Sequence, residues 1–434
     1  MRSASVMLLL GATILAGVSM TRQDAQPAGS GEGAGQRSGE TSNPAALAAE
    51  NTPDPFIRSL VAQLDLERYK ATIKALTRFG DRRQGTQRNR DAVDWIESQL
   101  KSYGYVTERI TYNPLPPARG CGPSVPLTAS APAARGAARG GRGDFPNGQG
   151  GSRLYGNRVA VAVNCDPNLQ PDLQIRELDS APILPGPVSE VYCTKVGATH
   201  PDEMYVIGAH MDGHGYNQAA NDDGSGTALV MEVARILGAP AISTKRSIRF
   251  VLWNGEETGL EGSRAYVAQR GDLQGKEDPP GSGRFPEPRW LAVIQHDMMM
   301  WDHGMPHADG TVSKEQRPEA DVNIEFQSTS KKAAESQALA WVFHSANQRY
   351  ATDYPAEVGP HMTNTDSGPF EDLAPAISVR ENERGRQIGA GWDPNWHQAS
   401  DVFTTYSDKD FRLGLNAAQT TLAAIGTLTG ATVK

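Results

Sequence analysis

The sequence predicts an α/β fold in which a mixed, mostly parallel central sheet is flanked by helices. Beyond Gly186, short apolar runs of strand length alternate with longer segments whose apolar residues recur at helical spacing. Histidines and acidic residues repeatedly follow the apolar runs, and ligands of open α/β sheets bind beyond the carboxyl ends of the strands. With 434 residues, 38% of them hydrophobic, the chain can bury a large core.

The folded part begins near Pro55, where the apolar residues take up helical spacing. Packed helices are expected over 56–64, 66–79 and 92–103. The run from Tyr105 to Tyr112 then predicts a strand, which Pro114 ends because proline lacks the N–H that a strand ladder needs.

The region beyond Gly186, where strand-like and helical segments alternate, supplies the centre of the predicted sheet. Strands are expected at Ser189–Val196, Met204–Ala209, Ser247–Trp253, Trp290–Gln295 and Ala376–Arg380. Helices are expected at Gly224–Leu237, Leu260–Arg270, Lys332–Tyr350 and Asp410–Thr427. We therefore predict one catalytic domain over 55–434.

An irregular insertion interrupts this domain at about 114–186, and only 158–164 within it has the pattern of a strand. Its Arg-Gly repeats at 134–143 are typical of a solvated loop or an RNA-binding segment. The formal net charge of -8 and the pI of about 5.7 favour the loop, because nucleic-acid binding needs a concentrated basic surface. We expect no nucleic-acid partner.

The N-terminus has the features of a secretory signal peptide. Residues 1–20 combine a basic start with an apolar run over 6–18, which is shorter than the roughly 20 apolar residues of a spanning helix. Residues 21–54, rich in Gly, Ala, Ser, Gln and Pro, predict a disordered leader. The protein is expected to be secreted or periplasmic, with no stable membrane partner; an uncleaved N-terminal anchor is the alternative.

The three cysteines of an exported chain suggest one disulfide and one free thiol. Cys193 lies in a strand-like stretch, so a buried thiol is the simpler interpretation there. Cys121 and Cys165 are left as the expected pair.

Charged residues follow two predicted strands of the sheet. His210 and Asp212 come after one strand, and the adjacent Glu256 and Glu257 come after the next. A lone histidine or an acid pair is usually structural or solvated. Here, however, the two acids directly follow the apolar run 251–253, where uncompensated charge is costly.

Further candidates stand at comparable positions. Asp297 follows a third strand, Asp222 and Asp223 lie at a helix start, where aspartate is usually a cap, and His397 lies in a polar loop. Imidazole nitrogens with carboxylate oxygens form the donor set that zinc prefers. The combination predicts a metal site.

Five motifs occur across residues 205–401: Gly208-Ala-His-Met-Asp212, Ala220-Asn-Asp-Asp-Gly-Ser-Gly226, Asn254-Gly-Glu-Glu-Thr-Gly-Leu-Glu-Gly-Ser-Arg-Ala-Tyr266, His296-Asp-Met298 and Trp396-His-Gln-Ala-Ser-Asp401. Together they resemble the di-zinc aminopeptidase family, which includes secreted bacterial leucine aminopeptidases, glutamate carboxypeptidase and, more distantly, glutaminyl cyclase. The resemblance implies the zinc aminopeptidase fold, similar to that of phosphorylase/hydrolase-like proteins.

The resemblance also implies a ligand set for two Zn2+ ions per chain. His210 and Asp297 would hold one zinc, Glu257 and His397 the other, and Asp222 would bridge both. Two metals so placed polarise a scissile carbonyl and lower the pKa of a shared water toward about 7.

The remaining roles follow from the same resemblance. Asp212 would orient His210 through its far ring nitrogen. Glu256 would be the general acid/base that takes the proton of the metal-bridging water and passes it to the departing amine. Asp223 becomes a helix-start residue, and His214 has no assigned role.

Two positions depart from the family pattern. Trp396 stands where several members have a tyrosine, and an indole N–H donates a hydrogen bond but cannot accept one or ionise. Ser367 stands where the family has a histidine. These changes bear on oxyanion stabilisation and on the pocket wall.

An aminopeptidase acting on peptides is the expected function. A carboxypeptidase of the same family is the nearest alternative, because Arg380, Arg384 or Arg386 could bind a substrate carboxylate. Glutaminyl cyclisation is a third option, and a non-catalytic binding domain is a fourth. The intact ligand positions and Glu256 favour hydrolysis.

Overall fold

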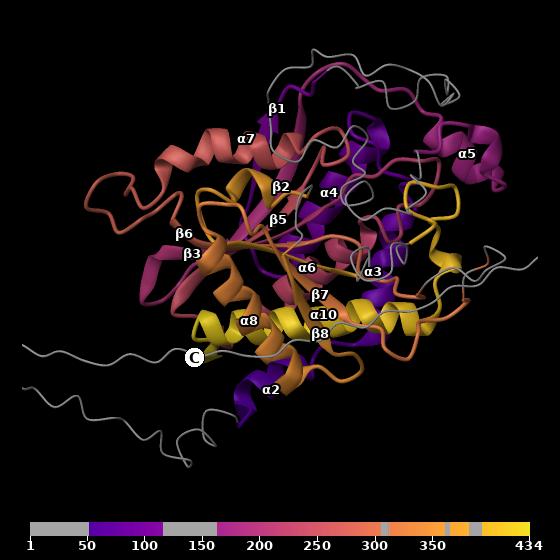
Figure 1. Ribbon diagram of the computed structural model, residues 1–434. Helices are drawn as coiled ribbons and strands as arrows, with labels where there is room; N and C mark the ends of the chain where they lie inside the picture. The colour runs from indigo at the N-terminus through magenta and orange to yellow at the C-terminus, as the bar shows by residue number, and fades with distance from the viewer. Residues whose placement is uncertain (1–51, 116–162, 305–310, 312, 361–364, 382–392) are drawn as a thin grey trace, which may run out of the picture. The chain divides into compact units, whose positions relative to one another are not determined.

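The computed structural model describes residues 52–115, 163–304, 311, 313–360, 365–381 and 393–434 (Figure 1). The signal peptide, the leader up to residue 51 and most of the predicted insertion lie outside these residues, as does Cys121. The strand expected over 158–164 is described only at its last two residues, which are not in a strand. The domain boundaries therefore stay a prediction.

A mixed sheet of eight strands forms the centre of the described domain, in the order β1-β2-β5-β3-β6-β9-β7-β8. The strands are β1 Thr107–Tyr112, β2 Val188–Lys195, β3 His200–His210, β5 Arg246–Trp253, β6 Arg289–His296, β7 Val322–Phe326, β8 Ala356–Gly359 and β9 Ala376–Glu381. The neighbours β5, β3, β6 and β9 are parallel, whereas β1, β2 and β7 each pair antiparallel with a neighbour. The predicted mixed, mostly parallel central sheet is confirmed.

Helices cover both faces of this sheet, with α7 on one side and α10 on the other (Figure 1). One apolar core contains residues of α2 Pro55–Val61, α3 Leu66–Thr77, α4 Gln87–Ser102, α6 Gly224–Leu237, α8 Ala333–Tyr350 and α10 Asp408–Leu428. On the opposite face, Tyr266 of α7 (Glu261–Arg270) packs with Trp253, Trp290 and Phe370. The helix α6 packs between the sheet and α3 and α10, and nearly all of its residues are buried.

The predicted helices and central strands are all present, with ends shifted by a few residues, but some elements were missed. β7 reads Val-Asn-Ile-Glu-Phe, and its polar residues break the apolar run that marked the other strands. Both polar residues are buried, and the hydrogen bond that Asn323 donates to Glu325 at 2.5 Å offsets part of the cost. The helix α5, Leu173–Asp179, lies in the segment that the sequence marked as irregular.

The cysteines follow the expected division where they are described. Cys165 is disulfide-bonded, and Cys193 is a buried free thiol whose pKa is raised by burial. Within the described ranges, no helix is both long and apolar enough to cross a membrane.

Candidate metal centre

The parallel strands bring the candidate residues to one edge of the sheet. β3 ends at His210, and Asp297 directly follows the end of β6. Beyond the end of β5, Gly255 takes a φ of 76°, a left-handed conformation that turns the chain so that Glu256 and Glu257 follow. Residues from separate parts of the sequence therefore meet at the carboxyl ends of adjacent strands, as the sequence predicted.

One group of possible ligands is formed by His210, Asp222 and Asp297, which are all buried. Nε2 of His210 lies 3.1 Å from Oδ1 of Asp222 and 3.7 Å from Oδ1 of Asp297. One imidazole nitrogen thus faces two carboxylates, which is a donor set for a divalent cation.

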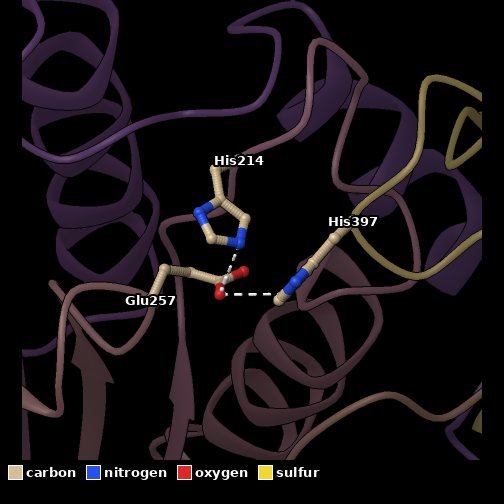
Figure 2. Close-up of side chains that lie close together, drawn as sticks. All are labelled: His214, Glu257 and His397. Atoms are coloured by element: carbon tan, nitrogen blue, oxygen red, sulfur yellow. Dashed lines mark ion pairs between the residues drawn. The ribbon is translucent and has the colours of Figure 1, made fainter. Parts of the chain in front are cut away.

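A second group contains Glu257, His397 and His214 (Figure 2). Oε2 of Glu257 lies 2.9 Å from Nε2 of His397 and 3.1 Å from Nε2 of His214. Glu257 and His397 were predicted to lie together, whereas His214 was left without a role. Its neighbours in sequence are glycines, so the pattern around it contained no signal for a ligand.

Asp222 lies between the two groups. Its Oδ1 faces His210, and its Oδ2 lies 3.0 Å from Nε2 of His397. The next residue, Asp223, caps α6 by accepting a hydrogen bond from the backbone N–H of Gly226 at 2.8 Å. The adjacent acids thus have separate tasks, and the assignment of Asp223 to the helix start is confirmed.

Asp212 contacts His210 differently from the expectation. Nδ1 of His210 lies 3.1 Å from the backbone oxygen of Asp212, whereas the Asp212 carboxylate is 3.8 Å from that nitrogen. The carboxylate instead accepts hydrogen bonds from the backbone N–H groups of Glu256 at 3.2 Å and Glu257 at 3.4 Å. Asp212 therefore orients the histidine through its main chain and the glutamates through its side chain.

The charges of the cluster shift several pKa values. Burial lowers the pKa of His397, but the carboxylates of Glu257 and Asp222 outweigh it and raise that pKa to about 10. Burial raises the pKa of Asp212 to about 6, and it raises that of Glu256 well above its usual range. In the absence of a metal, protons on the imidazoles would supply part of the positive charge that this cluster of acids requires.

Unpaired polar atoms indicate that the cluster fits cations. Asp222 Oδ2, Glu257 Oε1 and His214 Nε2 are buried and make no hydrogen bond within the described part of the chain. Such atoms are costly unless something compensates them. Nitrogen and carboxylate oxygen donors with free lone pairs suit zinc.

A buried arginine that belongs to none of the five motifs supports the site. Arg82, with a φ of 52°, donates hydrogen bonds to the backbone oxygens of Met211 at 2.6 Å, Gln218 at 2.8 Å and Ala219 at 2.8 Å. It therefore fixes both ends of the loop between His210 and Asp222.

A polar network also holds the backbone beside Asp222. Asn221 donates to Glu381 at 2.8 Å and to Asp393 at 2.9 Å, and the N–H of Asp222 donates to Asp401 at 3.2 Å. This network comes from segments that are far apart in the sequence, so only the fold brings it together.

The other positions singled out from the sequence have these surroundings. Trp396 is buried, and its ring centroid lies 4.0 Å from that of His397. His296 points into the core, where its ring nitrogens contact Thr421 and the backbone oxygen of Gly208. Arg380 is buried near the end of β9. Burial and the charge of Asp393 raise the pKa of the adjacent Glu381, and the charge of Arg380 opposes this shift. Arg384 and Arg386 lie outside the described residues.

The fold and the site define a class: an α/β protein whose adjoining groups of histidines and carboxylates at one sheet edge suit divalent metal ions. Residues 190–420 match Peptidase family M28. Since this match covers more than half of the 434 residues, the protein belongs to Peptidase family M28. The resemblance drawn from the five motifs is confirmed.

Individual relatives agree with this assignment. Aminopeptidase YwaD of Bacillus subtilis is 44% identical over 68 residues, which cover 16% of this chain and 14% of that protein. Carboxypeptidase Q of Xenopus laevis is 34% identical over 71 residues, which cover 16% of this chain and 15% of that protein. The matched segments are thus a small part of both relatives.

A solved structure, that of a zinc aminopeptidase from Bacillus subtilis, has a similar fold. It aligns with a TM-score of 0.55 and 17% identity over 84% of this chain and 95% of that one. The likeness confirms the fold class.

Proposed function

We propose that the protein is an exported di-zinc aminopeptidase, which releases N-terminal residues from peptides. The position of Asp222 carries this proposal, since its two carboxylate oxygens face His210 at 3.1 Å and His397 at 3.0 Å. A carboxylate between two groups of donors suits a bridge between two metal ions. Membership of Peptidase family M28 supports peptides as the substrate class. The basic start and apolar run of residues 1–20 support export.

Five residues would hold the metals. One zinc would be bound by His210 and Asp297, the other by Glu257 and His397, and Asp222 would bind both. When bound, zinc supplies polarisation of the scissile carbonyl and acidification of a water molecule.

Glu256 would act as the general base and then as the general acid. It lies in one group with His210 and Glu257, with ligand atoms within 4.8 Å of one another. A carboxylate oxygen of Glu256 would accept a proton from the attacking water and return it to the departing amine nitrogen. The hydrogen bond from its backbone N–H to Asp212 holds its main chain in place for this transfer.

The charges around Glu256 favour a substrate with a free amine. Burial raises the pKa of Glu256 most; the charge of His210 lowers it, and the carboxylates of Glu257, Asp297 and Asp366 raise it. Asp366 is buried, and one of its oxygens has no hydrogen bond in the described part of the chain. Asp366 is assigned to no metal, so its carboxylate would complement the α-ammonium group of a substrate, whereas a C-terminal carboxylate would need a cation.

A carboxypeptidase is the second candidate, because the similarity to carboxypeptidase Q is of the same order as the similarity to an aminopeptidase. A panel of matched peptides with a free amine, an acetylated amine or an amidated C-terminus separates the two activities. We expect that acetylation abolishes cleavage and that amidation does not. Cleavage that survives acetylation but is lost on amidation would instead identify a carboxypeptidase.

Two further activities can be tested with the same preparation. Release of ammonia and ring closure from a peptide with N-terminal glutamine would identify a glutaminyl cyclase. A purified protein that holds no zinc and cleaves none of the peptides would be a binding domain.

A further inference from the structure

We propose that His214 is an additional metal ligand, which gives the ion held by Glu257 and His397 a second imidazole. This inference rests on the proposed di-zinc function. It concerns a residue that the five motifs do not include.

The first observation is the convergence of three donor atoms. Nε2 of His214 and Nε2 of His397 lie 3.1 Å and 2.9 Å from the same oxygen of Glu257. The two imidazole rings are perpendicular, at 88°, with centroids 4.1 Å apart, and they approach the Glu257 carboxylate from different sides (Figure 2). Donors placed 2.0–2.1 Å from a tetrahedral zinc are about 3.3 Å apart, so these spacings are close to those around one ion.

The second observation concerns the surroundings of Nε2 of His214. It is buried and makes no hydrogen bond with the described residues, even though an oxygen of Glu257 lies near it. The side chain as a whole is 19% exposed, compared with 6% for His397. Nε2 of His214 is therefore directed at the oxygen of Glu257 that His397 also faces, without a hydrogen bond that would occupy it.

The third observation is that the backbone holds His214 in place. Asn217 donates from its Nδ2 to the backbone oxygens of His214 at 3.0 Å and Gln398 at 2.9 Å. Asn164 donates from its side chain to the backbone oxygen of Gly215 and from its N–H to that of His397, both at 2.9 Å. These asparagines tie the loop of His214 to the loop of His397.

The glycine that follows His214 allows the two loops to approach closely. Gly215 has a φ of 118°, and a Cβ at this position would lie 2.6 Å from the backbone oxygen of His397. A side chain there would push the loops apart. The contact between the two histidine loops is therefore built into the sequence and not a chance approach of two flexible side chains.

The extra ligand would make the two metal positions unequal. Counting Asp222, the position beside Glu257 would have four protein donors: His214, Glu257, His397 and Asp222. The position beside His210 would have three. Four protein donors are typical of a closed, tightly held zinc, whereas three leave a place for water or substrate. The ion held by His210, Asp297 and Asp222 would then keep a place for water or substrate, and the ion beside Glu257 would be the more tightly held of the two.

The test compares two variants of the full chain, His214→Ala and His214→Gln, with the wild type. His344→Ala on α8 is the control, because it removes a histidine elsewhere. Zinc content is measured after dialysis against a graded chelator, and cobalt-substituted protein is examined by visible absorption. Wild type should release its two ions in two steps. In both His214 variants the affinity for the tightly held ion should fall about 100-fold or more, since loss of a residue that only hydrogen-bonds to a metal ligand already lowers metal affinity about 10–100-fold. The cobalt band should change in the His214 variants and not in His344→Ala.

Other results would overturn the inference in distinguishable ways. If both His214 variants keep two ions with wild-type affinity and an unchanged cobalt spectrum, His214 is not a ligand, and the di-zinc proposal stands. The same holds if only the KM for peptides rises, which would make His214 a substrate contact. If wild type itself binds no metal, the proposed function fails together with this inference. Thermal melting of the chelated variants shows whether they remain folded.

Discussion

The carboxylate of Asp212 accepts a hydrogen bond from the backbone N–H of Glu256 at 3.2 Å, which joins the chain beyond β3 to the chain beyond the neighbouring β5. The second carboxylate oxygen accepts the N–H of Glu257 at 3.4 Å. Both glutamates therefore have the same support on their main chains. Their side chains differ, since Glu257 contacts two histidines and Glu256 lies beside His210.

This difference predicts opposite results for two matched substitutions. Glu256→Gln should reduce kcat by about 100-fold or more, the range for loss of a general base, and should leave zinc content unchanged. Glu257→Gln should lose zinc, because an amide is a poor ligand for it. Activity and metal content are measured on the same preparations. If Glu256→Gln is the variant that loses zinc, the roles of the two glutamates have been exchanged.

Arg82 predicts a coupling between a buried arginine and the metal site. Arg82→Lys removes the planar guanidinium that donates to four backbone oxygens at once, and a lysine ammonium cannot contact all of them in that geometry. Each buried oxygen left unpaired costs about 1–3 kcal/mol. We expect a lower Tm and weaker zinc binding.

The neighbouring Arg83→Lys is the matched control, because Arg83 is only half-buried and should tolerate the change. Calorimetry and zinc titration of both variants test the prediction. Equal zinc affinity in Arg82→Lys and wild type would show that the loop between His210 and Asp222 is fixed without the guanidinium.

Some residues of the candidate site could be predicted from the sequence alone, and others could not. His210, Glu256, Glu257 and Asp297 could be predicted because each stands within four residues of the end of an apolar run, so the nearby strand sets its place at the sheet edge. Arg82 could not, since it contacts residues more than 120 positions away along the chain.

Other features depended on loop geometry or on buried polar residues. His214 faces the metal donors only because a loop with a positive φ at Gly215 meets the loop of His397. The strand β7 was missed because Asn323 and Glu325 are buried as a hydrogen-bonded pair, which sequence patterns treat as exposed. Side chains that satisfy one another cannot be recognised before the fold brings them together.

Removal of metal should destabilise the folded protein. The acids of the two groups repel one another without cations, and a ligand at 100 times its Kd stabilises the native state by about 2.7 kcal/mol. A chelator should therefore lower the Tm of wild type, and added zinc should restore it. Asp222→Asn, which lacks the bridging carboxylate, should show a much smaller shift. An identical shift in both proteins would mean that the chelator acts elsewhere.

Stability should also depend on pH through Glu371, which belongs to none of the groups of possible metal ligands among the described residues. Burial, with a smaller effect of Asp372, raises the pKa of Glu371 to about 8. Because the unfolded pKa is about 4.3, the native state binds an extra proton between these values, so its stability is highest below pH 4 and falls as pH rises to 8. The slope from this one group is at most about 1.4 kcal/mol per pH unit. Glu371→Gln should remove it.

Urea unfolding at pH 5, 7 and 9 gives the free energy of unfolding of variant and wild type. The difference between the two measures the effect of Glu371, because the contributions of other titrating groups and of metal binding largely cancel. Glu371→Gln should gain stability relative to wild type from pH 5 to pH 8 and gain no more beyond that. The exposed Glu177→Gln controls for the loss of one negative charge. A constant difference between Glu371→Gln and wild type at all three pH values would show that Glu371 ionises normally in the folded protein, with water reaching its carboxylate despite the surrounding side chains.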